Sequence, residues 1–111
     1  MPTNRNQLRQ DAVEFAALVN KICAKIKERS YYTERMYHAV VVIGSTLTSL
    51  RNSRDEVSLV RRLNVAIDAC SEIMFVAKLL LVEEFLFEDD YKLIKKSVSS
   101  IERRMISCLS D

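Results

Sequence analysis

Apolar residues recur at intervals of three and four positions along four separate segments of this chain. In the first segment, about Asn6 to Arg29, one stripe holds Leu8, Ala12, Phe15, Ala16, Val19, Ile22, Cys23 and Ile26. In the last segment, about Glu88 to Ser107, the same spacing joins Tyr91, Ile94, Val98, Ile101, Met105 and Cys108. This period is typical of an α-helix with one buried face, so both segments are predicted to be amphipathic helices.

The second segment is predicted to be a helix from about Glu34 to Leu50. Ser30, Tyr31 and Tyr32 interrupt the apolar pattern before it, and Thr33 is in position to cap its first turn. The β-branched run at 40–43 would suit a buried strand on its own, but no partner strand exists elsewhere in the sequence. Gly44 lowers helix stability by about 1 kcal/mol, which indicates a position where another helix approaches closely.

The third segment, about Glu56 to Glu84, follows a polar connection at 51–55 and has apolar residues on two sides. One face holds Ile73, Val76, Ala77, Leu80 and Leu81, and the roughly opposite face holds Phe75, Leu79 and Val82. A helix in a four-helix bundle buries one face. The second stripe therefore predicts a contact with another copy of the chain, unless an edge of the fourth helix or a loop covers it.

Length and composition agree with long helices in one domain that spans residues 1–111. A chain of 111 residues can bury one core. It contains one glycine and one proline, whereas strands joined by tight turns need many of both. Four helices with short connections predict an all-α, antiparallel, up-down-up-down four-helix bundle. The longest apolar stretch, 73–82, is interrupted by Lys78 and is too short to span a membrane.

The cysteines predict buried thiols. Cys23, Cys70 and Cys108 lie far apart among apolar neighbours, which fits neither a zinc site nor a disulfide framework. Buried free thiols are typical of a reducing compartment. The first residues carry no apolar core of a secretory signal. We therefore expect a cytoplasmic protein.

Other polar groups do not form a pattern that we associate with catalysis or metal binding. His38, the only histidine, has Glu34 one turn away, which is typical of a surface pair. Asp68 and Glu72 are spaced for salt bridges on a helix, and a di-metal bundle would need further inward carboxylates and Glu-x-x-His motifs. An acidic cluster surrounds the predicted turn between the third and fourth helices, at Glu83, Glu84, Glu88, Asp89 and Asp90. We expect no enzymatic activity, no metal and no cofactor.

The distribution of charge matters more than its total. The net charge is +2, from 17 basic and 15 acidic residues, so a nucleic-acid site would depend on clustering. In the predicted bundle, eight of the ten arginines map to one end: Arg5, Arg9, Arg51, Arg54, Arg61, Arg62, Arg103 and Arg104. Guanidinium groups suit phosphate. The alternative is an ordinary solvated end, because acidic residues lie among these arginines and arginine also complements helix C-termini.

The second half of the chain contains a pattern with a known counterpart. Leu63, Ala66 and Glu72 form Leu-x-x-Ala-x-x-x-x-x-Glu, and an aromatic–Leu turn and an acidic helix start follow at Phe85-Leu86, Glu88-Asp89-Asp90 and Tyr91. This pattern resembles the four-helix-bundle proteins encoded in intervening sequences of bacterial 23S rRNA genes. The accessory variability determinant (Avd) of diversity-generating retroelements is a relative with the same bundle.

The chain also departs from that family. Residues 46–54 replace its Ser-Ile-Pro-x-Asn-Ile-Ala-Glu-Gly segment, Asp68 replaces a small residue that is usually glycine, and Glu84 replaces a turn glycine. The resemblance implies a homo-oligomer, often a pentameric ring, without enzymatic activity. In the retroelement branch it also implies a basic surface that binds nucleic acid and assists a reverse transcriptase. The leading hypothesis is thus an oligomeric adaptor for RNA or DNA. The alternative is a structural or protein-interaction bundle that does not bind nucleic acid.

Overall fold

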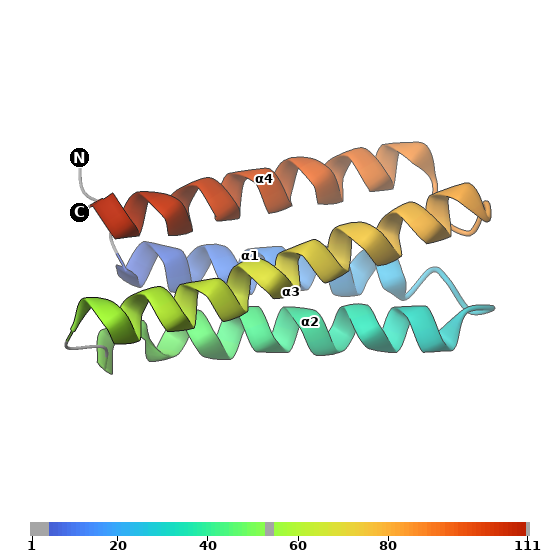
Figure 1. Ribbon diagram of the computed structural model, residues 1–111. Helices are drawn as coiled ribbons and strands as arrows, with labels where there is room; N and C mark the ends of the chain where they lie inside the picture. The colour runs from blue at the N-terminus through green and yellow to red at the C-terminus, as the bar shows by residue number, and fades with distance from the viewer. Residues whose placement is uncertain (1–4, 53–54, 111) are drawn as a thin grey trace.

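The computed structural model describes residues 5–52 and 55–110. In these ranges it contains four α-helices, one short 3₁₀ helix and no strand (Figure 1). They are α1 (Arg5–Cys23), α2 (Ser30–Thr48), the 3₁₀ helix η1 (Ser49–Asn52), α3 (Glu56–Val82) and α4 (Glu88–Ser110). The all-α prediction is confirmed, and the β-branched run at 40–43 is helical.

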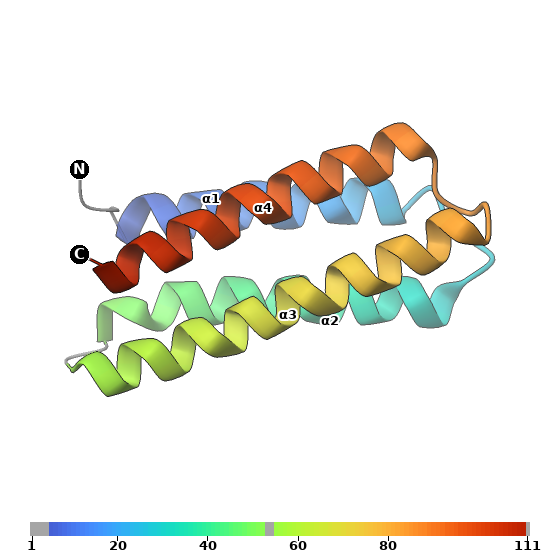
Figure 2. The ribbon, with the colours of Figure 1, turned by 45° about the horizontal axis from the view of Figure 1, so that its top comes forward.

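The connections between the helices lie at two ends of an elongated molecule. α1 begins, η1 leads toward α3, and α4 ends on the left in Figure 1, whereas the α1–α2 and α3–α4 connections lie on the right. Figure 2 shows the same arrangement from another direction. Each helix contacts its neighbour in the order α1, α2, α3, α4 and back to α1. The contact between α2 and α3 is the most extensive of the four, and that between α1 and α4 is the least.

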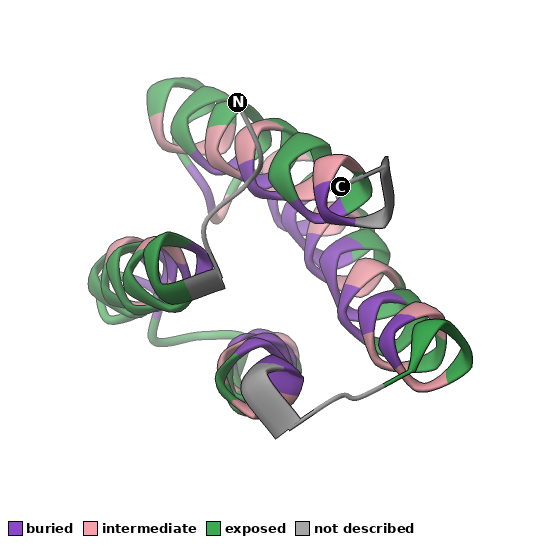
Figure 3. Cartoon of the chain, turned by 90° about the vertical axis from the view of Figure 1, so that its left-hand side faces the viewer, coloured by how far each residue is buried: buried purple, intermediate pink, exposed green. Residues whose placement is uncertain are grey.

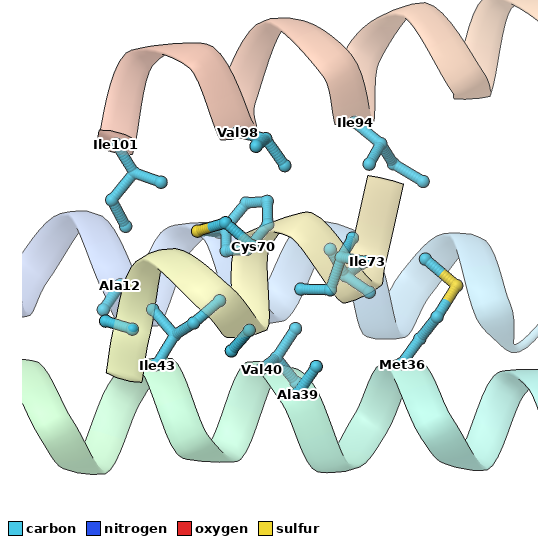
Figure 4. Close-up of a cluster of buried hydrophobic side chains, with 14 of the residues drawn as sticks. Ala12, Met36, Ala39, Val40, Ile43, Cys70, Ile73, Ile94, Val98 and Ile101 are labelled. Carbon is cyan, nitrogen blue, oxygen red and sulfur yellow. The ribbon is translucent and has the colours of Figure 1, made fainter. Parts of the chain in front are cut away.

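The core lies between the four helices, on the inward faces that Figure 3 colours as buried. Ile94, Val98 and Ile101 of α4 point toward the side chains of α2 and α3 (Figure 4). The predicted apolar stripes of the first and last helices are buried, except that Ala16 and Tyr91 are partly exposed. Full burial of one large aliphatic side chain contributes about 1.5–3 kcal/mol, so these stripes determine which face of each helix turns inward.

α1 ends earlier than the sequence pattern predicts. Its last residue is Cys23, and the N–H groups of Lys25 and Ile26 donate to carbonyls only three residues back, at 3.1 and 3.0 Å. This is the tighter spacing of a 3₁₀ turn. Ile26 nevertheless remains buried. The apolar period therefore continues past the end of the helix, which explains the error in its boundary.

The start of α2 differs from the predicted one. The helix begins at Ser30, and the residue at its N-cap, Arg29, makes no side-chain capping hydrogen bond. Thr33 lies inside the helix and is buried, so the predicted cap is wrong. Its hydroxyl donates to the carbonyl of Ser30 at 3.1 Å. Because a buried hydroxyl needs a partner, starting the helix one turn earlier gives Thr33 an acceptor.

The prediction for Gly44 is also wrong. A Cβ atom placed on Gly44 would meet no heavy atom within 4 Å, apart from the helix's own backbone and its chain neighbours. Gly44 lies beside an open groove between α1 and α2 rather than at a close helix crossing. Packing within one copy therefore leaves room for a side chain at position 44.

The two ends of α3 are held by local hydrogen bonds. At its start, the Asp55 side chain accepts from the Ser58 N–H at 2.7 Å, as an N-cap does. At its end, Glu84 has a φ of 67°, in the left-handed region. The Glu84 and Phe85 N–H groups donate to the carbonyls of Leu81 and Leu80, at 3.1 and 2.9 Å. This is the Schellman pattern, in which glycine usually occupies the position of Glu84.

Candidate nucleic-acid interface

Most of the described arginines gather at the end of the bundle where α1 and α3 begin. We call this end the arginine end, and the opposite end, with the acidic α3–α4 turn, the acidic end. Arg9 lies in the first turns of α1, Arg61 and Arg62 near the start of α3, and Arg103 and Arg104 near the end of α4. Arg5 and Arg51 belong to α1 and η1, but their side chains are not described, and Arg54 lies outside the described residues.

Two of these arginines contribute to the structure of the arginine end. The Arg62 guanidinium donates to the Ser49 carbonyl at 3.1 Å, which joins α3 to the C-terminal end of α2. Arg104 forms an ion pair with Asp11, which joins α4 to α1. A cation at a helix C-terminus also complements the helix dipole. Arg62 and Arg104 therefore connect helices as well as adding positive charge.

Three further arginines remain available to a ligand. Arg9, Arg61 and Arg103 are exposed, and none makes a hydrogen bond or ion pair to another described residue. They lie on three different helices. Arg9 lines the groove between α1 and α2, and Arg103 lies beside Ser100 and Ser107 at an open depression on α4. The fold brings these arginines to one end but spreads them over different faces.

The acidic cluster at the opposite end is largely paired. Asp90 contacts Lys25 at 3.0 Å, Glu83 contacts Arg29 at 3.7 Å, and Glu88 contacts Lys92 at 3.6 Å. The ring of Phe85 lies under the Arg29 guanidinium at 4.6 Å. Glu88, Asp89 and Asp90 occupy the first turn of α4 as predicted, where the helix dipole favours negative charge.

The predicted interface stripe on α3 is exposed in this single chain. Phe75 and Val82 are 67% and 68% exposed, and Leu79 is partly exposed. The opposite stripe is buried at Ile73, Val76, Ala77 and Leu80, with Leu81 partly exposed. Neither α4 nor a described loop covers Phe75 and Val82, so these side chains are free for an intermolecular contact.

The remaining candidate groups have structural surroundings. Glu72 forms an ion pair with Arg35 of α2 at 2.6 Å, although the two groups are not aligned for a hydrogen bond. Asp68 and His38 are exposed. Burial raises the pKa of Cys23 to about 11; burial, together with the charge of Glu102, raises the pKa of Cys70 to about 12. Both thiols are therefore protonated at neutral pH.

The described residues contain neither a metal-binding cluster nor a membrane-spanning helix. No group of three or more His, Cys, Asp or Glu side chains in 5–52 and 55–110 is arranged to hold a metal ion. Within the same ranges, no helix has both the length and the apolar character needed to cross a bilayer.

One feature was not predicted from the sequence: a groove between α1 and α4. It has a volume of about 450 Å³, and its lining includes Leu18 and Leu93, of which Leu93 is 48% exposed. Both residues fall outside the two predicted core stripes. Their apolar character at the edges of amphipathic helices was the signal that could have indicated the groove.

Comparison with known structures supports the fold. The chain is similar to a protein of unknown function from the S23 ribosomal protein family of Bacteroides thetaiotaomicron, with a TM-score of 0.85. The two chains share 16% identity over 96% of this chain and 98% of the other. At this identity the likeness shows the fold alone. Comparisons with protein-family models and with curated proteins found no match.

Proposed function

We propose that this protein is a non-enzymatic, homo-oligomeric adaptor that binds nucleic acid through its arginine end. The observation that carries the proposal is the group of exposed arginines at that end, Arg9, Arg61 and Arg103, without partners among the described residues. Lysine and arginine contacts to phosphate release condensed counterions, which supplies affinity without reading a base sequence. The ligand class is therefore RNA or DNA recognised through its backbone.

Oligomerisation strengthens this proposal because the arginines of one copy lie on different faces. In a ring, the arginine ends of several copies lie side by side and form a continuous basic rim. We propose an antiparallel, up-down-up-down bundle assembled into such a ring, pentameric as the family resemblance implies. The alternating ends of the connections support the bundle topology, as do the Asp11–Arg104 and Lys25–Asp90 pairs between α1 and α4.

Two observations support membership of the rRNA intervening-sequence family: the sequence pattern from Leu63 to Tyr91, and the fold shared with an S23-family protein. Glu84 adds a third, because it adopts the left-handed conformation at the position where the family has a turn glycine. Within this family, assistance to a reverse transcriptase is the role of the Avd branch, and we propose it as the setting in which nucleic-acid binding would act.

The test removes two exposed arginines without disturbing the bundle. Arg9→Gln with Arg103→Gln should weaken binding of a labelled single-stranded RNA and of a duplex DNA, measured by fluorescence anisotropy from about 50 to 200 mM salt. If both side chains contact phosphates on duplex DNA, the slope of log K against log salt should flatten by roughly two units. Arg62 and Arg104 are left unchanged because they connect helices.

The matched control removes two exposed lysines, Lys27→Gln with Lys95→Gln, and should change the salt slope little. Lys27 belongs to the α1–α2 connection, and neither side chain makes a hydrogen bond or ion pair with a described residue. A wild-type oligomer that binds neither RNA nor DNA at about 50 mM salt would overturn the proposal. The structural roles of Arg62 and Arg104 favour one alternative, a structural or protein-interaction bundle whose arginine end only holds helices together.

A further inference from the structure

The outer face of α3 carries a row of four exposed residues at seven-residue spacing. From the arginine end toward the acidic end they are Arg61, Asp68, Phe75 and Val82, and every one is exposed. Residues seven apart lie on nearly the same line of a helix, about 10 Å from one another. The row is therefore a ridge with two charged positions followed by two apolar ones.

The groove between α1 and α4 lies on a different side of the bundle. Its lining includes four apolar side chains, Phe15, Leu18, Leu93 and Ile101. The groove has a volume of about 450 Å³, and α1 and α4 contact each other less than any other neighbouring pair. The groove can therefore admit side chains from outside the molecule.

The rims of this groove carry charges in a defined order. α1 contributes Asp11 and Glu14, and α4 contributes Lys96 and Arg104. The Lys25–Asp90 and Asp11–Arg104 pairs fix the register of the two helices. Asp11 on α1 and Lys25 just after its end are as far apart in the sequence as Asp90 and Arg104 on α4. In this register, a path from the acidic end toward the arginine end passes Leu93, then Lys96, then Glu14 and Asp11.

We propose that the α3 ridge of one copy docks into the α1–α4 groove of a second copy, with the arginine ends of both copies pointing the same way. This inference rests on the proposed homo-oligomer and names its two surfaces. Phe75 then lies against Leu93, Asp68 lies near Lys96, and Arg61 lies near Asp11. Each of these three ridge residues meets a partner of matching character. In the assembly Arg61 therefore belongs to the subunit contact, and Arg9 and Arg103 remain for nucleic acid.

The spacings agree with this arrangement. Along the ridge, Asp68 lies about 10 Å from Phe75, and Arg61 about 21 Å. Along the groove, Lys96 lies about 5 Å from Leu93, and Asp11 about 17 Å. The distances along the ridge and along the groove differ by about 4 to 6 Å, which lysine and arginine side chains can span. In the reverse direction, Asp68 would approach Asp90 and the apolar Val82 would approach Lys96, which disfavours that orientation.

A second copy is the occupant because this chain supplies both complementary surfaces. Ridge and groove lie on different parts of the same molecule, so the contact is heterologous, and each copy offers one surface to each neighbour. Such contacts form a ring when the rotation closes. A parallel arrangement also keeps all arginine ends on one side of the assembly.

The decisive test reverses one charge on each surface. Asp68→Lys should weaken self-association by about tenfold or more, as measured by sedimentation velocity across a concentration series, and so should Lys96→Glu. An equimolar mixture of the two variants should associate again, although a five-membered ring cannot alternate the two variants completely and would retain one unfavourable contact. In the mixture, the ridge of the Asp68→Lys variant places its new lysine against the new glutamate in the groove of the Lys96→Glu variant. When the Lys96→Glu variant supplies the ridge and the Asp68→Lys variant the groove, the native Asp68 faces the native Lys96. Lys95→Glu, next to the groove residue but outside its lining, is the matched control and should not weaken association.

A third variant separates this contact from other modes of association. Phe75→Ala removes an exposed side chain, so the bundle should stay folded by circular dichroism while self-association weakens. An oligomeric wild type whose association is unchanged by Asp68→Lys and Lys96→Glu would overturn the docking geometry and leave the proposed oligomer intact. Loss of association without rescue in the mixture would also overturn it. A monomeric wild type would overturn both this inference and the oligomer.

Discussion

The two ends of the bundle are both densely charged but use their charges differently. At the acidic end, basic residues neutralise the cluster through the Lys25–Asp90, Arg29–Glu83 and Lys92–Glu88 pairs. At the arginine end, Arg62 and Arg104 have protein partners, whereas other exposed arginines have none in the described chain. The excess of one sign, rather than the number of charges, determines how much charge remains for a ligand.

The largest effects should come from the apolar residues that close each end. Leu50 in η1 is fully buried at the arginine end, and Leu86 is 6% exposed at the acidic end. Replacing either leucine by alanine should lower the free energy of unfolding by about 2–5 kcal/mol, more for Leu50, because each change leaves a cavity. Urea unfolding followed by circular dichroism measures this loss.

The control for this comparison is Val57→Ala, which changes an exposed side chain at the arginine end. Its effect should stay within about 0.5 kcal/mol. If Leu50→Ala cost no more than this control, the arginine end would be loosely packed, and its arginines would lie on a mobile surface rather than a fixed one.

A smaller effect should come from the acidic residues at the starts of α3 and α4, which begin at opposite ends of the bundle. The Asp55 side chain accepts the Ser58 N–H at the start of α3, so Asp55→Ala should lower the free energy of unfolding by about 1 kcal/mol. Asp89, in the first turn of α4, is exposed and makes no side-chain hydrogen bond to a described residue. Asp89→Ala should cost only about 0.3 kcal/mol, from the helix dipole. Equal losses in chemical denaturation would contradict the capping geometry.

The last predicted effect is a gain in stability at the acidic end. Glu84 has a φ of 67°, where a side chain costs energy that glycine avoids. Glu84→Gly should therefore raise the free energy of unfolding by about 0.5–1 kcal/mol. The neighbouring Glu83 has a φ of −82°, and Glu83→Gly should lower stability. A melting temperature that rises for Glu84→Gly and falls for Glu83→Gly would support the Schellman turn, and the opposite order would exclude it.

The helices could be predicted from the sequence because burial of a stripe imposes a period that the residues display. The stripe residues from Leu8 to Ile22, apart from Ala16, and from Ile94 to Met105 are buried as their spacing indicates. The boundaries were harder, because Ile26 continues the period after the backbone has left the helix, and Thr33 resembles a cap but needs an acceptor inside α2. Apolar spacing records burial, whereas a helix terminus depends on a few local hydrogen bonds.

The candidate site was predictable only in part. Charge counting along the helices placed the arginines at one end, but it could not separate Arg62, which bonds the Ser49 carbonyl, from Arg61 next to it, which has no partner among the described residues. That difference depends on where α2 ends relative to α3. The α1–α4 groove was missed because a gap between helices depends on how closely they pack, which no single helix encodes.

The buried cysteines have a consequence for labelling chemistry. With a pKa of about 11, Cys23 is deprotonated in roughly one molecule in several thousand at about pH 7.5, and Cys70 in fewer still. Cys108 is likewise buried, with 7% of its surface exposed. A cysteine introduced at an exposed position would therefore react with a maleimide dye far faster than any native thiol. The natural sequence can thus serve directly as the background for attaching a single fluorophore to either end of the bundle.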